Sequence, residues 1–149
     1  MQHLKPPRIK QEFLDRLLRR VNRKDWWHVT PRDTGSYSKR GKFLSSTYRE
    51  AEFYGRPNDV PEHVDVCDPL VGDEKTIEAL LLGQPVVHHP NLDNAAEQQL
   101  AIDAKLYRAA RAKGYDAIVL MSPIGYRRFL TEGRIPLSIE LNLLVGDWK

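Results

Sequence analysis

The chain of 149 residues is poor in the features that mark secreted scaffolds and membrane proteins. It has a single cysteine, Cys67, which cannot form an internal disulfide and favours a reducing compartment at the point of action. No segment approaches the roughly 18 apolar residues of a membrane span, and no apolar segment follows the basic residues near the start. We therefore expect no membrane span and a cytoplasmic site of action, in the protein's own cell or in a target cell.

Motifs for phosphate and metal binding are also missing from the sequence. Neither GxGxxG nor a P-loop occurs. His63 with Cys67, and His88 with His89, lack the spacing of a four-ligand set, so no metal is expected. Hydrophobic residues make up 41% and charged residues 29% of the chain, which is typical of a globular protein. We expect one domain over residues 1–149, large enough to bury a core without disulfides or metals.

Positive charge is concentrated at the start of the chain. Residues 1–24 carry eight Lys and Arg against two acids, a net charge of +6, so the remaining residues sum to −3. Apolar residues recur there at helical spacing and predict a basic amphipathic N-terminal helix: Ile9, Phe13, Leu14, Leu17, Leu18 and Val21. Its basic side is either a solvated face or a surface that attracts nucleic acid, another anionic surface or ligand phosphates.

The rest of the chain alternates between short strands and helices. Strands are predicted over 26–30, 42–46, 64–67, 115–121 and 135–144. Helices are predicted over 73–82 and 94–113, with a brief helix before Gly55 and a turn or short helix near 126–129. In the longest helix, Leu100, Ile102, Leu106 and Tyr107 are expected to face inward. Residues 36–41 and 88–91 are expected to be loops, and the whole indicates a mixed α+β domain.

The last predicted strand carries a single carboxylate, that of Glu140. Alternation along a strand directs Ile139, Leu141 and Leu143 into a core, while Glu140 and its neighbours Ser138 and Asn142 share the other face. A carboxylate among aliphatic residues is costly unless a partner or a ligand satisfies its charge. Glu140 is therefore either a functional residue or a solvent-facing residue of an edge strand.

Three separated segments of the chain resemble one enzyme family. The first is His28-Val29-Thr30, and the last is Leu137-Ser138-Ile139-Glu140-Leu141. Between them, Phe43-Leu44-Ser45-Ser46-Thr47 is followed by Ala51-Glu52-Phe53-Tyr54. In this order they resemble the diphtheria-toxin-like mono-ADP-ribosyltransferases of the His-Tyr-Glu type. The resemblance implies mainly antiparallel split sheets around an NAD cleft, with flanking helices.

The resemblance also implies a role for each matched residue. Glu140 would be catalytic, stabilising positive charge on the ribose as nicotinamide leaves NAD+ and holding the 2′-hydroxyl. His28 would orient the dinucleotide through the adenosine-side ribose, and Tyr54 would stack on nicotinamide. Ser45 or Ser46 would steady the cleft through a hydroxyl hydrogen bond.

Two positions depart from the family pattern. Val29, which precedes Thr30 in the first segment, stands where the family prefers Gly, although backbone contacts to the dinucleotide would survive. Leu44 stands where a second nicotinamide-facing Tyr is common, so a second ring would have to come from elsewhere: Tyr37, Tyr48 or Phe53. Ser138 replaces the second acid of arginine-modifying relatives, which makes arginine a less suitable acceptor unless Glu132 approaches.

The expected function is NAD+-dependent mono-ADP-ribosyl transfer, a pentosyl transfer with NAD+ as substrate, onto a macromolecular acceptor, either protein or nucleic acid. A small toxin, effector or phage-type modifier fits this description, and a toxin implies an immunity or inhibitor partner. Two alternatives remain. One is a non-catalytic binding or inhibitor domain that uses the same fold and the basic N-terminal helix. The other is an RNA-processing transferase, for which a cluster of arginines in the cleft would be expected.

Overall fold

Six helices, two short 3-10 turns and four strands make up the described part of the chain, residues 7–87 and 94–146 of a computed structural model. The α+β composition is therefore confirmed. In chain order the elements are α1 (Gln11–Arg23), η1 (Thr34–Ser36), α2 (Tyr37–Arg40), β1 (Lys42–Ser45), α3 (Tyr48–Ala51), η2 (Glu52–Tyr54), β2 (Pro69–Gly72), α4 (Glu74–Leu82), α5 (Ala95–Ala112), β3 (Ala117–Leu120), α6 (Pro123–Glu132) and β4 (Glu140–Leu143).

The four strands form one mixed sheet in the order β1-β4-β3-β2. β4 is antiparallel to β1 and to β3, and β2 is parallel to β3. Glu140 thus lies on an inner strand, which rules out the edge-strand interpretation. Within the described residues the predicted split into two sheets is not seen. The expected strand 26–30 is reduced to two isolated bridges, between Trp26 and Glu62 and between Trp27 and Ser45.

The predicted strand over 64–67 is wrong, and the hydrogen bonds of its backbone explain why. The amide of Val66 donates to the side chain of Asn22, and the amide of Cys67 donates to the carboxylate of Asp116. Asp116 also accepts from the amide of the next residue, Asp68. Side chains therefore take the donors that a neighbouring strand would need, and pairing begins only at β2.

Side-chain caps set the helix starts that the sequence indicates. Asp73 accepts from the amide of Thr76 at the start of α4, and Ser122 accepts from Gly125 at the start of α6. Thr47 caps α3 in the same way. The expected loop 36–41 instead contains the short helix α2. The expected loop 88–91 lies outside the described residues. No described helix is long and apolar enough to cross a membrane.

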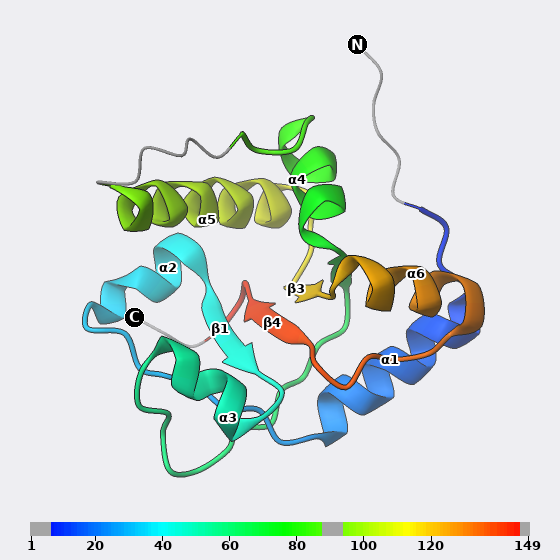
Figure 1. Ribbon diagram of the computed structural model, residues 1–149, viewed down its shortest axis with the longest axis horizontal. Helices are drawn as coiled ribbons and strands as arrows, with labels where there is room; N and C mark the ends of the chain where they lie inside the picture. Colours follow the sequence, from blue (N-terminus) through cyan, green and yellow to red (C-terminus); the bar gives the residue numbers. More distant parts are fainter. Residues whose placement is uncertain (1–6, 88–93, 147–149) are drawn as a thin grey trace.

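Helices cover both faces of the sheet (Figure 1). On one face, α1 and α6 pack through Phe13, Leu17 and Phe129 against Val119 and Leu141. On the other face, α4 and α5 form a second core around Ile77, Tyr107 and Ile118. Adjacent residues of one strand therefore serve opposite layers, as alternation requires. The second layer leaves space beside its core, and that space positions the candidate site.

Gly133 joins α6 to the segment that leads into β4, and α1 packs closely against it. Its φ of +71° is in the left-handed region, and a Cβ at this position would overlap the Phe13 ring and the Arg16 side chain. The left-handed conformation costs about 1–2 kcal/mol for other residues, and the steric overlap adds to it. Gly133→Ala is expected to destabilise the protein by about 2–4 kcal/mol in urea unfolding. Gly83→Ala is the matched control, because its φ is +87° and a Cβ there meets nothing within 4 Å.

Candidate functional site

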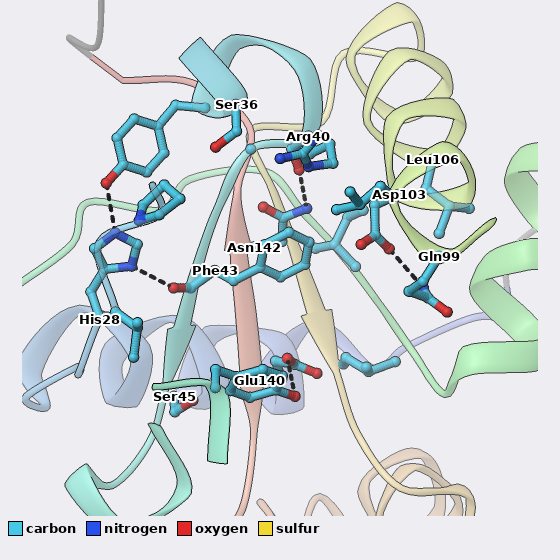
Figure 2. A pocket seen from close by; sticks show the side chains of 18 of the residues that line it. His28, Ser36, Arg40, Phe43, Ser45, Gln99, Asp103, Leu106, Glu140 and Asn142 are labelled. Carbon is cyan, nitrogen blue, oxygen red and sulfur yellow. Dashed lines mark hydrogen bonds between the residues drawn. The ribbon is translucent and has the colours of Figure 1, made fainter. Parts of the chain in front are cut away.

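A cavity of about 750 Å³ lies between the sheet and the helices α2, α4 and α5 (Figure 2). Its floor consists of two rows of side chains that cross the sheet. Ser45, Glu140 and Leu120 are register partners in the first row. Phe43, Asn142 and Ile118 are register partners in the second, and all six line the cavity. Two residues of the expected polar face of the last strand, Glu140 and Asn142, therefore line the cavity, whereas Ser138 does not.

The carboxylate of Glu140 lies in the middle of the first row. Burial raises the pKa of Glu140 above its ordinary value, the hydrogen bond from Tyr54 opposes that rise, and the nearby negative charge of Asp103 adds to it. No cation forms an ion pair with Glu140 among the described residues. The group is thus held in a position where its negative charge is costly, which suits the stabilisation of a positively charged ligand.

The hydroxyl of Tyr54 donates to Oε1 of Glu140 at 3.0 Å. Partial burial, followed by the negative charge of Glu140 and this hydrogen bond, raises the pKa of Tyr54 to about 12. The phenol therefore remains a donor at neutral pH. The residue is 62% exposed and lines the cavity, and its ring makes an edge-on contact with Phe53. The helix that delivers it ends at Gly55, whose φ is +143°.

His28 lines the opposite part of the cavity and is held by both ring nitrogens. Nδ1 lies 2.8 Å from the Phe43 carbonyl, which only accepts, so Nδ1 carries the proton and donates. Nε2, 2.8 Å from the Tyr37 hydroxyl, then accepts from it. Burial and the positive charge of Lys42 lower the pKa of His28, so the ring is neutral near pH 7. A direct bond from Nε2 to a ribose would have to replace the one to Tyr37.

The structure brings five of the seven predicted site residues to this cavity: His28, Val29, Ser45, Tyr54 and Glu140. Ser46 and Thr30 do not line it. The Ser46 hydroxyl accepts from the amide of Ile139 and lies within hydrogen-bond distance of the Leu137 carbonyl, so it fixes the approach to β4. The exposed Thr30 side chain donates to Asn58 at 3.1 Å.

Of the aromatic residues considered as a second stacking partner for nicotinamide, only Tyr37 lines the cavity. Phe43, which the sequence did not suggest, lines it as well. Tyr48 packs edge-on against Trp27 and does not line the cavity. Phe53 is 87% exposed and lies outside it. Leu44 is buried on the opposite face of the sheet, which explains why no ring at that position faces the ligand space.

Sequence reasoning missed four charged residues of the cavity, namely Arg40, Glu74, Glu78 and Asp103. Asp103 follows Leu100 by three residues and precedes Leu106 by three, so it lies on the helix face already assigned inward. Burial raises its pKa, and the positive charge of Arg40 opposes that rise. Arg40 comes from α2, in the stretch expected to be a loop, where no sequence signal indicated a site. Figure 2 shows the side chains of Asp103 and Arg40 above the sheet, on the same side as Asn142.

Asn142 adds a polar group that the protein leaves unsatisfied. Its Nδ2 donates to the carbonyl of Arg40 at 3.0 Å. Its Oδ1 is buried and has no hydrogen-bond partner in the part of the chain that the structure describes. An orphaned buried acceptor is costly.

The structure also shows where the residues considered for recognition of the acceptor lie. Glu132 ends α6 and does not line the cavity. The hydroxyl of Ser138 donates to Glu50 at 2.6 Å, so a carboxylate from α3 lies beside the position where the family's second acid would stand. Residues 7–87 and 94–146 contain no group of three or more potential metal ligands, and His88 and His89 lie outside them.

No family model, curated protein or solved structure matches this chain. The resemblance therefore rests on the residues of the chain itself and on how they are arranged around the cavity.

The raised pKa of Glu140 predicts a gain in stability when this residue is replaced by Gln. The folded state binds the Glu140 proton more tightly than the unfolded chain does, because the pKa of Glu140 is raised on folding. The stability that this bound proton contributes is fully present below the unfolded pKa of about 4.3 and is lost as the pH rises through the folded pKa. Glu140→Gln is expected to match the wild-type melting temperature near pH 4 and to exceed it near pH 8. A variant that melts below wild type at pH 8 would contradict the costly buried charge.

Proposed function

We propose that the protein is an NAD+-dependent mono-ADP-ribosyltransferase that binds NAD+ in this cavity. The observation that carries the proposal is the meeting of His28, Tyr54 and Glu140 around one cavity, although 112 positions separate the first from the last. The alternative of a solvent-facing Glu140 predicts no such enclosure. The cavity lining offers a carboxylate, an exposed aromatic ring and a guanidinium, which suit the nicotinamide ribose, the nicotinamide ring and the diphosphate, respectively.

In the proposed reaction, the bond between the ribose C1′ and the nicotinamide nitrogen breaks, and the bonding electron pair leaves with nicotinamide. Positive charge then develops on the sugar, and the ionised carboxylate of Glu140 stabilises it. An acceptor nucleophile forms the new bond to C1′ and releases its proton to solvent. Burial strengthens the interaction of Glu140 with the sugar, because fewer water molecules screen it.

The other groups position the dinucleotide. The exposed ring of Tyr54 stacks on the cationic nicotinamide ring. Arg40, the only Arg or Lys among the cavity-lining residues that the structure describes, meets the diphosphate. A ribose hydroxyl of the adenosine part takes the place of Tyr37 at His28 Nε2. The four acidic residues that line the cavity favour the cationic end of NAD+: Glu74, Glu78, Asp103 and Glu140.

The test is transfer of label from NAD+ by purified protein, with wild type beside Glu140→Gln. Each is incubated with NAD+ labelled in the adenylate part and with a cell lysate, and label is followed separately in protein and nucleic-acid fractions. We expect labelling that depends on Glu140, and the labelled fraction identifies the class of acceptor. Equal labelling by the two proteins would remove Glu140 from the mechanism. Absence of labelling and of nicotinamide release, with both proteins folded, would favour the non-catalytic binding domain.

A further inference from the structure

Four arginines form a stripe along α1, and the cavity does not explain them. Arg16, Arg19, Arg20 and Arg23 are spaced i, i+3, i+4 and i+7, which places them on one face of a helix. All four side chains are exposed. The adjoining face of α1 is buried through Phe13, Leu17 and Val21. We call these four residues the arginine stripe.

The positive charge of the arginine stripe is only partly offset on α1, where Glu12 and Asp15 precede Arg16 and Arg19 by four residues and the Arg16 guanidinium lies over the Phe13 ring. None of the ion pairs found in the described residues involves the stripe. The charge of Arg20 is one cause of the lowered pKa of Lys24, after burial of that amine, so the like charges repel. Arg16 with Arg20, and Arg19 with Arg23, are like-charged i, i+4 pairs that weaken a helix. An anionic partner would remove this cost.

The arginine stripe lies on the other side of the sheet from the cavity. α1 packs against Val119 and Leu141, whereas the cavity is lined by Glu140 and Asn142, which alternate with Leu141. No residue of α1 lines the cavity. Figure 1 shows α1 away from α2 and α5, the helices that cover the cavity. The helix therefore does not close over a bound dinucleotide, and its ligand is separate from the ligand of the cavity.

The residue types on α1 select among anionic partners. Arginine binds phosphate oxygens through a planar fork of donors and suits phosphodiesters better than lysine does. A helix that inserts into a lipid surface needs exposed apolar residues. A surface for single strands needs exposed aromatic rings for base stacking. α1 has neither, because none of the large hydrophobic residues that are exposed in the described chain belongs to it.

We propose that the arginine stripe binds the phosphate backbone of double-stranded nucleic acid without reading its sequence. From Arg16 to Arg23 the stripe extends about 10 Å, since a helix rises about 1.5 Å per residue. That length matches a short run of neighbouring phosphates on a duplex. The bound duplex holds the protein near nucleic acid or its associated proteins, while the cavity on the other side of the sheet stays open.

The proposal predicts a measurable dependence of affinity on salt. Contacts to four phosphates give a slope of log K against log salt of about −3 to −4, which is a loss of about 100-fold between 50 and 200 mM salt. The measurement is fluorescence anisotropy with a labelled DNA duplex of about two helical turns and an RNA duplex of the same length. A variant with all four stripe arginines replaced by Gln is expected to bind at least about tenfold more weakly and with a slope near zero.

Two further variants make the experiment decisive. Arg19→Gln with Arg23→Gln changes only two exposed residues and is expected to reduce the slope by about two units, which keeps the test valid if the fourfold variant unfolds. The matched control removes four exposed positive charges elsewhere: Arg56, Lys75, Lys105 and Arg108, each replaced by Gln. It is expected to retain most of the affinity and the slope. Glu140→Gln should bind duplex like wild type, so failure of the transferase proposal leaves this result unchanged.

Several outcomes would overturn the duplex proposal. Duplex binding that survives in the stripe variants, or that falls equally in the matched control, would show attraction by net charge alone. Binding to vesicles with anionic headgroups but not to duplex would assign the stripe to a membrane surface. Polyglutamate that binds as tightly as duplex would indicate an acidic protein partner, and equal affinity for a single strand would remove the preference for duplex. Absence of binding to all of these at low salt would leave the stripe as a solvated face.

Discussion

Glu140→Gln is expected to lower the rate of nicotinamide release from NAD+ by about 10²–10³-fold, the loss typical of removing one preorganised electrostatic contact. Gln keeps the size and most hydrogen bonds of Glu but lacks the negative charge that stabilises the developing cation. The KM for NAD+ should change only a few-fold, because the charge acts mainly in the transition state. The assay measures the initial rate at which labelled nicotinamide is released from NAD+ that carries the label in its nicotinamide part.

Glu132→Gln is the matched control for this prediction. Glu132 is exposed at the end of α6 and outside the cavity, so the same chemical change there should leave the rate unaltered. The wild-type rate should also fall at acid pH, because protonated Glu140 carries no charge. Since burial raises the pKa of Glu140, this fall should begin at a higher pH than for an ordinary glutamate. A fully active Glu140→Gln variant would end the catalytic assignment.

Tyr54→Ala is expected to weaken NAD+ binding by about 10- to 100-fold. Stacking of an aromatic side chain on a base contributes about 1–3 kcal/mol, and the positive charge of nicotinamide adds a cation–π contribution. Tyr54→Phe keeps the ring and loses only the hydrogen bond to Glu140. It should therefore bind NAD+ within a few-fold of wild type. Titration of each variant in a Glu140→Gln background measures affinity while turnover is slowed about 10²–10³-fold.

Tyr48→Ala serves as the control for an aromatic residue outside the cavity. Tyr48 lies on the neighbouring short helix, contacts Trp27 and does not line the cavity, so its loss should leave the affinity nearly unchanged. If Tyr54→Phe loses as much affinity as Tyr54→Ala, the hydroxyl rather than the ring would be the important group. If neither variant loses affinity, Tyr54 would have no role in binding.

Local patterns in the sequence predict much of this fold because they reflect short-range physics. Alternation around Glu140 separates the core residue Leu141 from the cavity residues, and the caps at Asp73 and Thr47 mark helix starts. The wrong strand over 64–67 shows the limit of such patterns. Its alternation is real, but Asn22 and Asp116, both more than 40 residues away, take its amide donors.

The candidate site likewise contains some residues that sequence patterns indicate and others that depend on tertiary packing. Glu140, Tyr54 and His28 are predicted from their motif context, and the inward face of α5 is predicted from its apolar residues, of which Leu100 is 45% exposed. Asp103 shares that face, but its role depends on a cavity that only the packing of α5 over the sheet creates. Arg40 depends on a helix of four residues, which is too short to leave a periodic signal. The strand order that makes β4 an inner strand is likewise set by tertiary packing.

The most direct test of the central claim is calorimetric titration of the Glu140→Gln variant with NAD+, beside the Tyr54→Ala, Glu140→Gln double variant. If the cavity is an NAD+ site, the single variant binds one NAD+ per chain, and the double variant binds about 10- to 100-fold more weakly. A folded single variant that binds no NAD+ at millimolar concentration, or a double variant that binds equally well, would contradict the assignment of this cavity to NAD+.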